Sequence, residues 1–210
     1  MKRFNLPKNK MNPTFIGSWK LFPLSTCDEL ISYFESNKNL HRRGTTGKGI
    51  DIKVKNSTDI VINPRYIHEP RNYIVKRYFD LLFSCYSDYI VQWPFINILP
   101  RNLQIGSFNI QRYKSGEHFQ EIHTERASLN TLHRVFAWMT YLNDVEAEHG
   151  GSTVFEHYDL EIQPEKGLTL IWPAEWTHAH KGNLLNAGSK YIITGWIDFP
   201  PPIKINPNTA

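Results

Sequence analysis

The chain has 210 residues, is 40% hydrophobic, and carries 24 lysines and arginines against 20 aspartates and glutamates, for a formal charge of +4. That length fits one domain better than two, and the positive excess is spread without a long basic run, so nucleic acid is not indicated as a partner. We find neither a secretory signal nor an apolar run of about 18 residues, and we expect a soluble, cytoplasmic protein without a membrane partner. The two cysteines, Cys27 and Cys85, are then expected to be reduced core thiols.

The N-terminal half contains two segments with helical periodicity and one expected hairpin. Ser25 precedes apolar residues at helical spacing, which predicts an N-cap and a helix over residues 26–36. Two short β-rich runs, 50–54 and 59–62, are separated by turn-prone residues and predict a hairpin. Apolar residues at spacings of three and four predict a second helix over residues 71–90.

From residue 103 onward the apolar period becomes two, and glycine-containing turns separate runs that are rich in aromatic and β-branched residues. Within 134–141 and 190–197, bulky side chains occupy both alternating faces, as in a two-sheet barrel or jelly roll. Because the helices precede the strands, we predict an α+β fold in which the helices support one outer face of the sheet. The expected organisation is a single domain over 1–210, with a helical support and hairpin over 1–102, a β core over 103–199 and a tail over 200–210.

The candidate metal ligands lie in the β half. His123 and Glu125 place an imidazole and a carboxylate on the same side of an extended segment, although His157 and Asp159 form the same pattern. An iron(II) site of the facial-triad type needs two histidines and one carboxylate, and leaves three positions open. His180 follows His123 by 57 residues, enough for about four short strands to return the chain to the same place, whereas it follows His157 by only 23. We therefore favour His123, Glu125 and His180 as the iron(II) ligands.

Further motifs occur in an order that one known family shares. They are Tyr113-Lys-Ser-Gly116, His123-Thr-Glu125, Arg134, Tyr141-Leu-Asn-Asp144, Gly150-Gly-Ser-Thr153-Val-Phe155, Pro173, His180, Gly188-Ser-Lys190 and Trp196. In this order the chain resembles the prolyl 4-hydroxylase-like iron(II)- and 2-oxoglutarate-dependent oxygenases, with motifs over residues 103–199. The resemblance implies a double-stranded β-helix, with iron(II) as the metal, 2-oxoglutarate and O2 as co-substrates, and ascorbate as a candidate reductant. The implied activity is that of a dioxygenase that hydroxylates its substrate and releases succinate and CO2.

The resemblance also assigns residues to the co-substrate. In such enzymes a basic residue ten positions after the distal histidine pairs with the far carboxylate of 2-oxoglutarate, and Lys190 stands ten positions after His180. Tyr113 and Thr153 would add hydrogen bonds to the same carboxylate. Trp196, six residues after Lys190, would line the site.

The substrate side is less defined than the metal side. Arg134 and Trp138 would face it, while the primary substrate, a protein side chain or a small molecule, is not specified by the core motifs. Residues 38–50 and 144–150 are expected to carry the choice of substrate.

Two departures from the family pattern bear on this interpretation. Glu125 stands where most members have aspartate, which lengthens the arm by one methylene but keeps an anionic oxygen ligand. A carboxylate at this position also argues against the halogenase variants, which leave it free for a halide. Tyr113 lies ten residues before His123 where the prolyl hydroxylases have nine, and Phe119 replaces a second tyrosine, so prolyl peptides are not the favoured substrate.

Two other classes of protein compete with this interpretation. A cupin-like metal enzyme would use His178 and His180 and need a glutamate about four residues later, where residues 183–185 are Asn-Leu-Leu. In a non-enzymatic β-sandwich binding module, the histidines and the glutamate would be accidental. Among the oxygenase assignments, His180 is favoured over His178 because it lies seven residues after Pro173 and ten before Lys190, as in the family.

Overall fold

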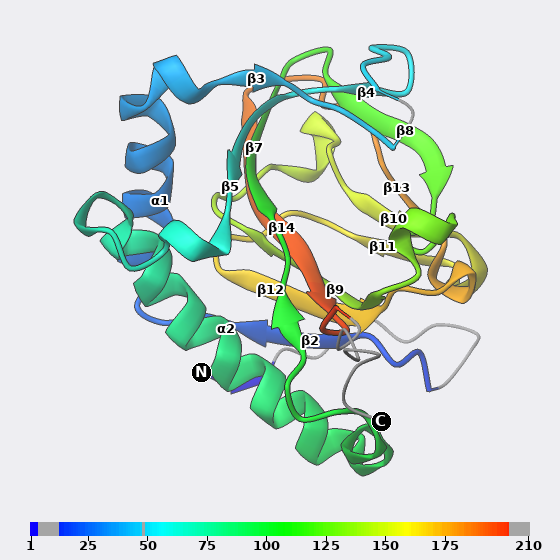
Figure 1. Ribbon diagram of the computed structural model, residues 1–210. Coiled ribbons are helices and arrows are strands. Elements are labelled where there is room, and N and C mark those ends of the chain that lie inside the picture. Colours follow the sequence, from blue (N-terminus) through cyan, green and yellow to red (C-terminus); the bar gives the residue numbers. More distant parts are fainter. Residues whose placement is uncertain (4–12, 48, 202–210) are drawn as a thin grey trace.

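Two antiparallel β-sheets pack face to face, and two helices lie on the outer side of the larger sheet (Figure 1). The computed structural model describes residues 1–3, 13–47 and 49–201. The larger sheet has the strand order β1 (Lys2–Arg3), β2 (Gly17–Lys20), β12 (Leu168–Pro173), β9 (Arg134–Tyr141), β14 (Ser189–Asp198), β7 (Phe108–Lys114), β5 (Thr58–Ile62), β3 (Arg42–Arg43), with β6 (Gln104–Ile105) pairing to β14. The smaller sheet has the order β11 (Leu160–Ile162), β10 (Thr153–Phe155), β13 (His180–Gly182), β8 (His118–His123), β4 (Lys55–Asn56). The predicted α+β jelly roll, a double-stranded β-helix with supporting helices, is confirmed.

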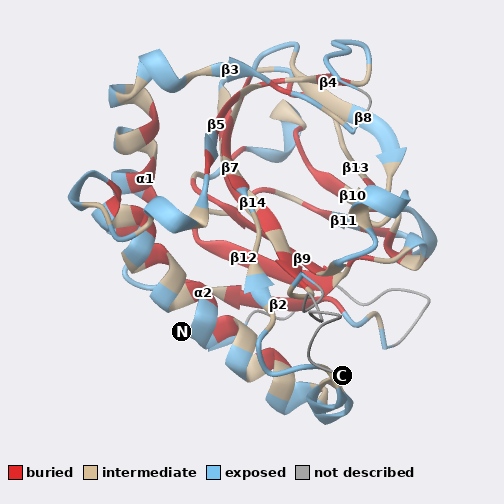
Figure 2. Ribbon diagram, viewed as in Figure 1, coloured by how far each residue is buried: buried red, intermediate tan, exposed pale blue. Residues whose placement is uncertain are grey.

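Both helices form where the apolar spacing predicted them. α1 spans Ser25–Ser36 and α2 spans Tyr73–Gln92. The buried side chains of α2 recur every three or four residues, so one stripe of the helix faces the sheet (Figure 2). The predicted cap at Ser25 is wrong, because Ser25 already belongs to the helix and the N-cap residue is Leu24, which makes no side-chain capping bond. No helix in the described ranges is both long and apolar enough to span a membrane.

The predicted hairpin between residues 50 and 62 is wrong. Residues 51–54 form a turn, and the strands that follow join different sheets, since β4 pairs with β8 whereas β5 pairs with β3 and β7. The chain therefore crosses from the smaller sheet to the larger one at Ser57. Strand β2 also joins the larger sheet, so the N-terminal half supplies strands as well as supporting helices. The single domain over 1–210 stays a prediction.

A buried ion pair stands at this crossing. Lys55 Nζ donates to Asp59 Oδ2 at 2.7 Å, and Ser57 Oγ donates to Asp59 Oδ1 at 2.7 Å. The Lys55 and Asp59 side chains are only 4% and 6% exposed. Because Lys55 belongs to β4 and Asp59 to β5, the pair joins the two sheets where the chain passes between them.

Two apolar clusters flank the larger sheet, one toward the helices and one toward the smaller sheet. Residues of β9 alternate between them, with Phe136 and Trp138 facing the helices and Ala137 and Met139 facing the smaller sheet. Over residues 136–139 of β9, a site between the sheets can therefore draw only on the second set of side chains.

We expect Asp59→Asn to lower the free energy of unfolding by about 3–5 kcal/mol, because it leaves the buried Lys55 charge without a partner. Urea unfolding followed by tryptophan fluorescence measures this change. The matched control is Asp80→Asn, which breaks the exposed pair that Asp80 forms with Lys76 at 3.3 Å and should cost less than about 1 kcal/mol. Equal effects of the two substitutions would contradict the structural role of the buried pair.

Candidate active site

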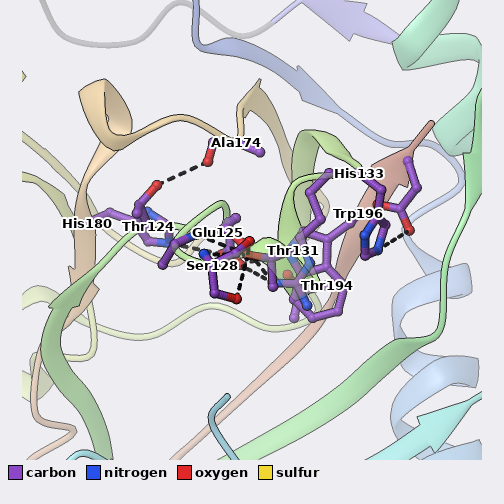
Figure 3. A network of polar contacts seen from close by, with 12 residues as sticks. Thr124, Glu125, Ser128, Thr131, His133, Ala174, His180, Thr194 and Trp196 are labelled. Carbon is purple, nitrogen blue, oxygen red and sulfur yellow. Dashed lines mark hydrogen bonds and ion pairs between the residues drawn. The ribbon is translucent and has the colours of Figure 1, made fainter. Parts of the chain in front are cut away.

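Three potential metal ligands converge between the two sheets. His123 ends β8 and His180 begins β13, and the antiparallel pairing of these strands sets the two histidines opposite each other. Glu125 lies two residues beyond His123, and potential ligand atoms of all three side chains lie within 4.8 Å of one another. Figure 3 shows Glu125 and His180 approaching each other from their separate segments. No second group of three such side chains is found within the described ranges.

Backbone carbonyls orient both imidazoles. His123 Nδ1 lies 2.8 Å from the carbonyl oxygen of Glu121, and His180 Nδ1 lies 2.9 Å from that of His178. A carbonyl oxygen only accepts hydrogen bonds, so each Nδ1 carries the proton and donates it. Each Nε2 keeps its lone pair for a metal, the usual arrangement when a second group orients a ligating histidine.

The protonation states suit a divalent metal. Burial, and then the proximity of His180, lowers the pKa of His123 to about 4, so its ring is neutral at pH 7. For Glu125, burial raises the pKa, but the neighbouring His180 and His123 rings and the hydrogen bond from Trp196 outweigh it and bring the pKa to about 2, so the carboxylate is ionised at pH 7. Neutral imidazoles with one carboxylate form the donor set of a facial-triad iron(II) site, so the residues present fit this metal.

Aromatic rings pack against both histidines. Phe119 stacks on His123 with ring centroids 3.8 Å apart, while Trp172 and Phe155 lie 5.2 and 5.5 Å from the His180 ring. The sequence had indicated Phe119 only as a departure from the family. Its position four residues before His123, on the same face of one strand, could have predicted the contact.

The Lys190 ammonium is buried between the sheets, and no carboxylate of the described chain pairs with it. Nζ donates to the Gly151 carbonyl at 2.7 Å and lies 4.7 Å from the centre of the Tyr113 ring, which is opposite Lys190 in the β14–β7 register. Gly151 has a φ of 72°, and a Cβ there would lie 2.9 Å from Leu185, so glycine is required where this carbonyl meets Lys190. Burial lowers the pKa of Lys190 to about 8. An ammonium in this position, with donors to spare, favours an anionic ligand.

The other two predicted co-substrate contacts already have protein partners. Tyr113 OH donates to Gln111 Oε1 at 2.8 Å, and Thr153 Oγ1 accepts from Tyr141 OH at 2.6 Å. The Thr153 hydroxyl therefore keeps its own proton for a ligand, whereas Tyr113 would have to leave Gln111. The contacts that Gln111 and Tyr141 make with Tyr113 and Thr153 were not predicted. The alternation of side chains along β7 could have placed Gln111 on the same inward face as Tyr113.

The two oxygens of the Glu125 carboxylate have different surroundings. Oε1 lies 3.4 Å from His180 Nε2, whereas Oε2 accepts a hydrogen bond from Trp196 Nε1 at 2.7 Å (Figure 3). The Arg134 guanidinium lies 3.6 Å from the centre of the Trp196 ring, and its Nη1 donates to the Glu125 carbonyl at 2.9 Å. Trp196 and Arg134 thus both contact Glu125, the candidate carboxylate ligand.

Trp138 does not lie at this site. Its side chain faces α2, with its ring 5.9 Å from that of Tyr78, so the prediction that it faces the substrate side is wrong. Alternation along β9 would have kept Trp138 and Arg134 on one face. The pairing register shifts between Arg134 and Phe136, and this bulge turns Arg134 toward Trp196 while Trp138 stays with the helices.

The competing ligand candidates are engaged elsewhere or lie apart. His178 is buried, with Nε2 2.9 Å from the Thr14 carbonyl and Nδ1 3.0 Å from Thr177 Oγ1, so both ring nitrogens have protein partners. His157 and Asp159 are exposed and do not belong to the ligand cluster.

Residues 108–198 match the family model described as the 2OG-Fe(II) oxygenase superfamily. This segment contains the three convergent ligand candidates as well as Lys190. The resemblance inferred from the motifs is therefore confirmed over residues 108–198, which match the 2OG-Fe(II) oxygenase superfamily.

Curated relatives extend the similarity toward the N-terminus. The Bos taurus procollagen-lysine,2-oxoglutarate 5-dioxygenase 1 is 24% identical over 187 residues, which cover 85% of this chain and 23% of that protein. The Gallus gallus protein of the same name is 26% identical over 184 residues, which cover 84% and 23%. The chain thus spans about a quarter of the length of these relatives.

Solved prolyl hydroxylases share the fold. The viral collagen prolyl hydroxylase of Paramecium Bursaria Chlorella virus-1, in complex with 2OG, has a TM-score of 0.64 at 18% identity and covers 90% of this chain and 98% of its own. The Trichoplax adhaerens prolyl hydroxylase, in complex with a hypoxia inducible factor peptide fragment, has a TM-score of 0.68 at 17% identity, with coverage of 89% and 84%.

We expect His180→Ala to weaken iron(II) binding by more than about 100-fold, beyond the 10–100-fold typical of residues that only support a ligand. His178→Ala should keep the metal bound, because the backbone carbonyl that orients His180 remains. Anaerobic iron(II) titration of the two variants measures the difference. Loss of iron from the His178 variant alone would show that the distal ligand has been misassigned.

We expect the affinity for 2-oxoglutarate to fall as the pH rises through about 8, where the buried Lys190 loses its proton. Lys190→Ala should weaken co-substrate binding by about 10- to 150-fold, the equivalent of a charge-assisted hydrogen bond, and should leave metal binding intact. Lys190→Arg keeps the charge at all these pH values and should remove the pH dependence. Calorimetric titration with the manganese form tests each point, and a pH-independent wild type would contradict the assignment.

Proposed function

We propose that the chain is an iron(II)- and 2-oxoglutarate-dependent dioxygenase that hydroxylates a C–H bond of its substrate and releases succinate and CO2. The observation that carries the proposal is that two donor sets share one interior. One is the cluster of His123, Glu125 and His180, whose two nitrogens and one carboxylate suit iron(II). The other is the buried Lys190 ammonium, which suits the far carboxylate of a dicarboxylic acid.

The chain's own groups divide the remaining work among them. Iron(II), when bound with 2-oxoglutarate and O2, supplies the oxidising chemistry. Lys190 and Thr153 anchor the co-substrate, with Tyr113 beside them, and the aromatic rings around the histidines exclude water. Arg134 has a side chain that is 21% exposed, and we assign it to the side of the site from which the substrate enters. Glu125 occupies the position that halogenases leave free, which supports hydroxylation.

The competing functions have less support. The cupin-like assignment needs His178 as a ligand, and both of its ring nitrogens are occupied. A non-enzymatic binding module would not account for the convergence of three potential ligand side chains or for the buried Lys190 ammonium.

A protein side chain is the substrate class that we propose. Two relatives are named for action on procollagen lysine, and one structural neighbour holds a peptide fragment. Residues 38–50 and 144–150 remain the predicted determinants of substrate choice. Cys27 and Cys85 are free and buried, which supports a reducing compartment such as the cytoplasm, and cell fractionation tests that location.

We expect the purified chain with iron(II) to convert 2-oxoglutarate to succinate without a primary substrate, at a slow uncoupled rate. Glu125→Ala should abolish this turnover and the bound iron, because it removes the anionic ligand. Asp159→Ala is the matched control, since it removes the carboxylate of the competing pair and should change neither quantity. Iron content and succinate are measured on the same samples. Retention of both by Glu125→Ala, or a wild type that binds neither metal nor 2-oxoglutarate, would contradict the proposed function.

A further inference from the structure

The Glu125 carboxylate is held from the side that faces away from the other ligands. Oε1 faces His180 Nε2 at 3.4 Å, and Oε2 receives the Trp196 indole N–H at 2.7 Å. The tryptophans of the described residues differ in this respect, because Trp19 also donates to a carboxylate, that of Asp88 at 2.9 Å, whereas the buried indole nitrogens of Trp93, Trp138 and Trp172 have no hydrogen-bond partner. Trp196 is thus one of two described tryptophans whose indole N–H holds a carboxylate, and its carboxylate is that of Glu125.

Arg134 holds both members of this contact. Its guanidinium stacks on the Trp196 ring at 3.6 Å, its Nη1 donates to the Glu125 carbonyl at 2.9 Å, and the same nitrogen lies 3.6 Å from Glu125 Oε2. The planar guanidinium can stack and donate at once, which an ammonium cannot do. Arg134 thus fixes the ring that holds the side chain and also the backbone that carries it.

We propose that Trp196 and Arg134 are positioning residues, which form a clamp that orients the long Glu125 arm and presents a single oxygen, Oε1, to the metal. The inference rests on the proposed function, because it takes Glu125 to be a metal ligand. A glutamate has one more rotatable bond than an aspartate and loses more side-chain entropy when it is ordered. The clamp orders the arm before the metal arrives.

The clamp also accounts for how a glutamate serves where aspartate is usual. With Oε2 bound to the indole, the carboxylate uses one coordination position and leaves three for the co-substrate and oxygen. An aspartate is one methylene shorter, so on the same backbone its carboxylate would draw back from the indole N–H that Glu125 Oε2 meets at 2.7 Å. The Trp196 hydrogen bond and the length of Glu125 are therefore coupled.

The test is a double-mutant cycle on metal affinity, measured by cobalt(II) titration without co-substrate or substrate. Trp196→Phe keeps an aromatic ring and removes the N–H, and it should weaken binding by about 10- to 100-fold, as losses of ligand-supporting contacts do. In the Glu125→Asp background the same substitution should change binding by less than about threefold, because the contact is already lost. Trp138→Phe is the matched control, since it alters a buried tryptophan of the neighbouring strand whose N–H is unused, and it should leave metal affinity unchanged.

Arg134→Lys provides an independent variant should Trp196→Phe fail to fold. It keeps the charge but loses the stack, and it should weaken cobalt(II) binding by about tenfold, at the lower end of that range. A role for Arg134 in contacting substrate alone would leave this affinity unchanged.

The outcomes separate this inference from the proposed function. A wild type that binds no metal refutes the proposed function itself. A wild type that binds metal, together with Trp196→Phe and Arg134→Lys variants of undiminished affinity, overturns the clamp alone. Equal losses from Trp196→Phe in the Glu125 and Glu125→Asp backgrounds would likewise overturn it, because the indole would then be acting through general packing.

Discussion

The pairing of β8 with β13 is the interaction on which the site depends, because it sets His123 directly opposite His180 across one antiparallel ladder. The backbone does most of the remaining work for these two ligands, since carbonyls two residues before each histidine fix the tautomer and the orientation of the ring. Glu125 lies beyond the end of β8 and has no ladder partner to place it. Its orientation must come from side chains, which is why Trp196 and Arg134 gather around it.

The two buried lysines, Lys55 and Lys190, differ in whether a carboxylate of the described chain neutralises their charge. Lys55 is paired with Asp59 at 2.7 Å, so its charge is neutralised within the chain where the two sheets meet. Lys190 has a carbonyl and an aromatic face as its neighbours, and burial lowers its pKa to about 8. A fold that needed only stability would favour an apolar side chain at this position. The presence of this buried ammonium is better explained by an anionic ligand that would neutralise its charge.

Patterns in the sequence correctly predicted the helices and the ligand cluster. They gave wrong predictions where strand pairing between distant segments, or a bulge, determines the structure. The helical periodicity located α1 and α2 within two residues, and the spacing of His123, Glu125 and His180 identified the cluster that the fold assembles. The hairpin failed because β4 takes its partner from β8, more than 60 residues away, and not from its neighbour in sequence. Trp138 was misplaced because a bulge shifts the alternation of β9 after Arg134, and a bulge of this kind leaves no signal in the spacing of side chains.

Strand β14, together with its neighbour β9, connects the candidate site to the core beneath the helices. On β14, Lys190 and Trp196 face the site, while Ile193 and Ile197 belong to the cluster beneath the helices. Gly195 lies between them opposite Trp138, and a Cβ at Gly195 would come within 2.6 Å of the Trp138 ring, so the absence of a side chain allows that ring to pack across β14. The proposed co-substrate anchor and the proposed clamp on Glu125 are therefore both on β14, whose opposite face packs in the core beneath the helices. Rigid packing on that face holds Lys190 and Trp196 at a constant separation, which a site that orders a dicarboxylate and a metal ligand together requires.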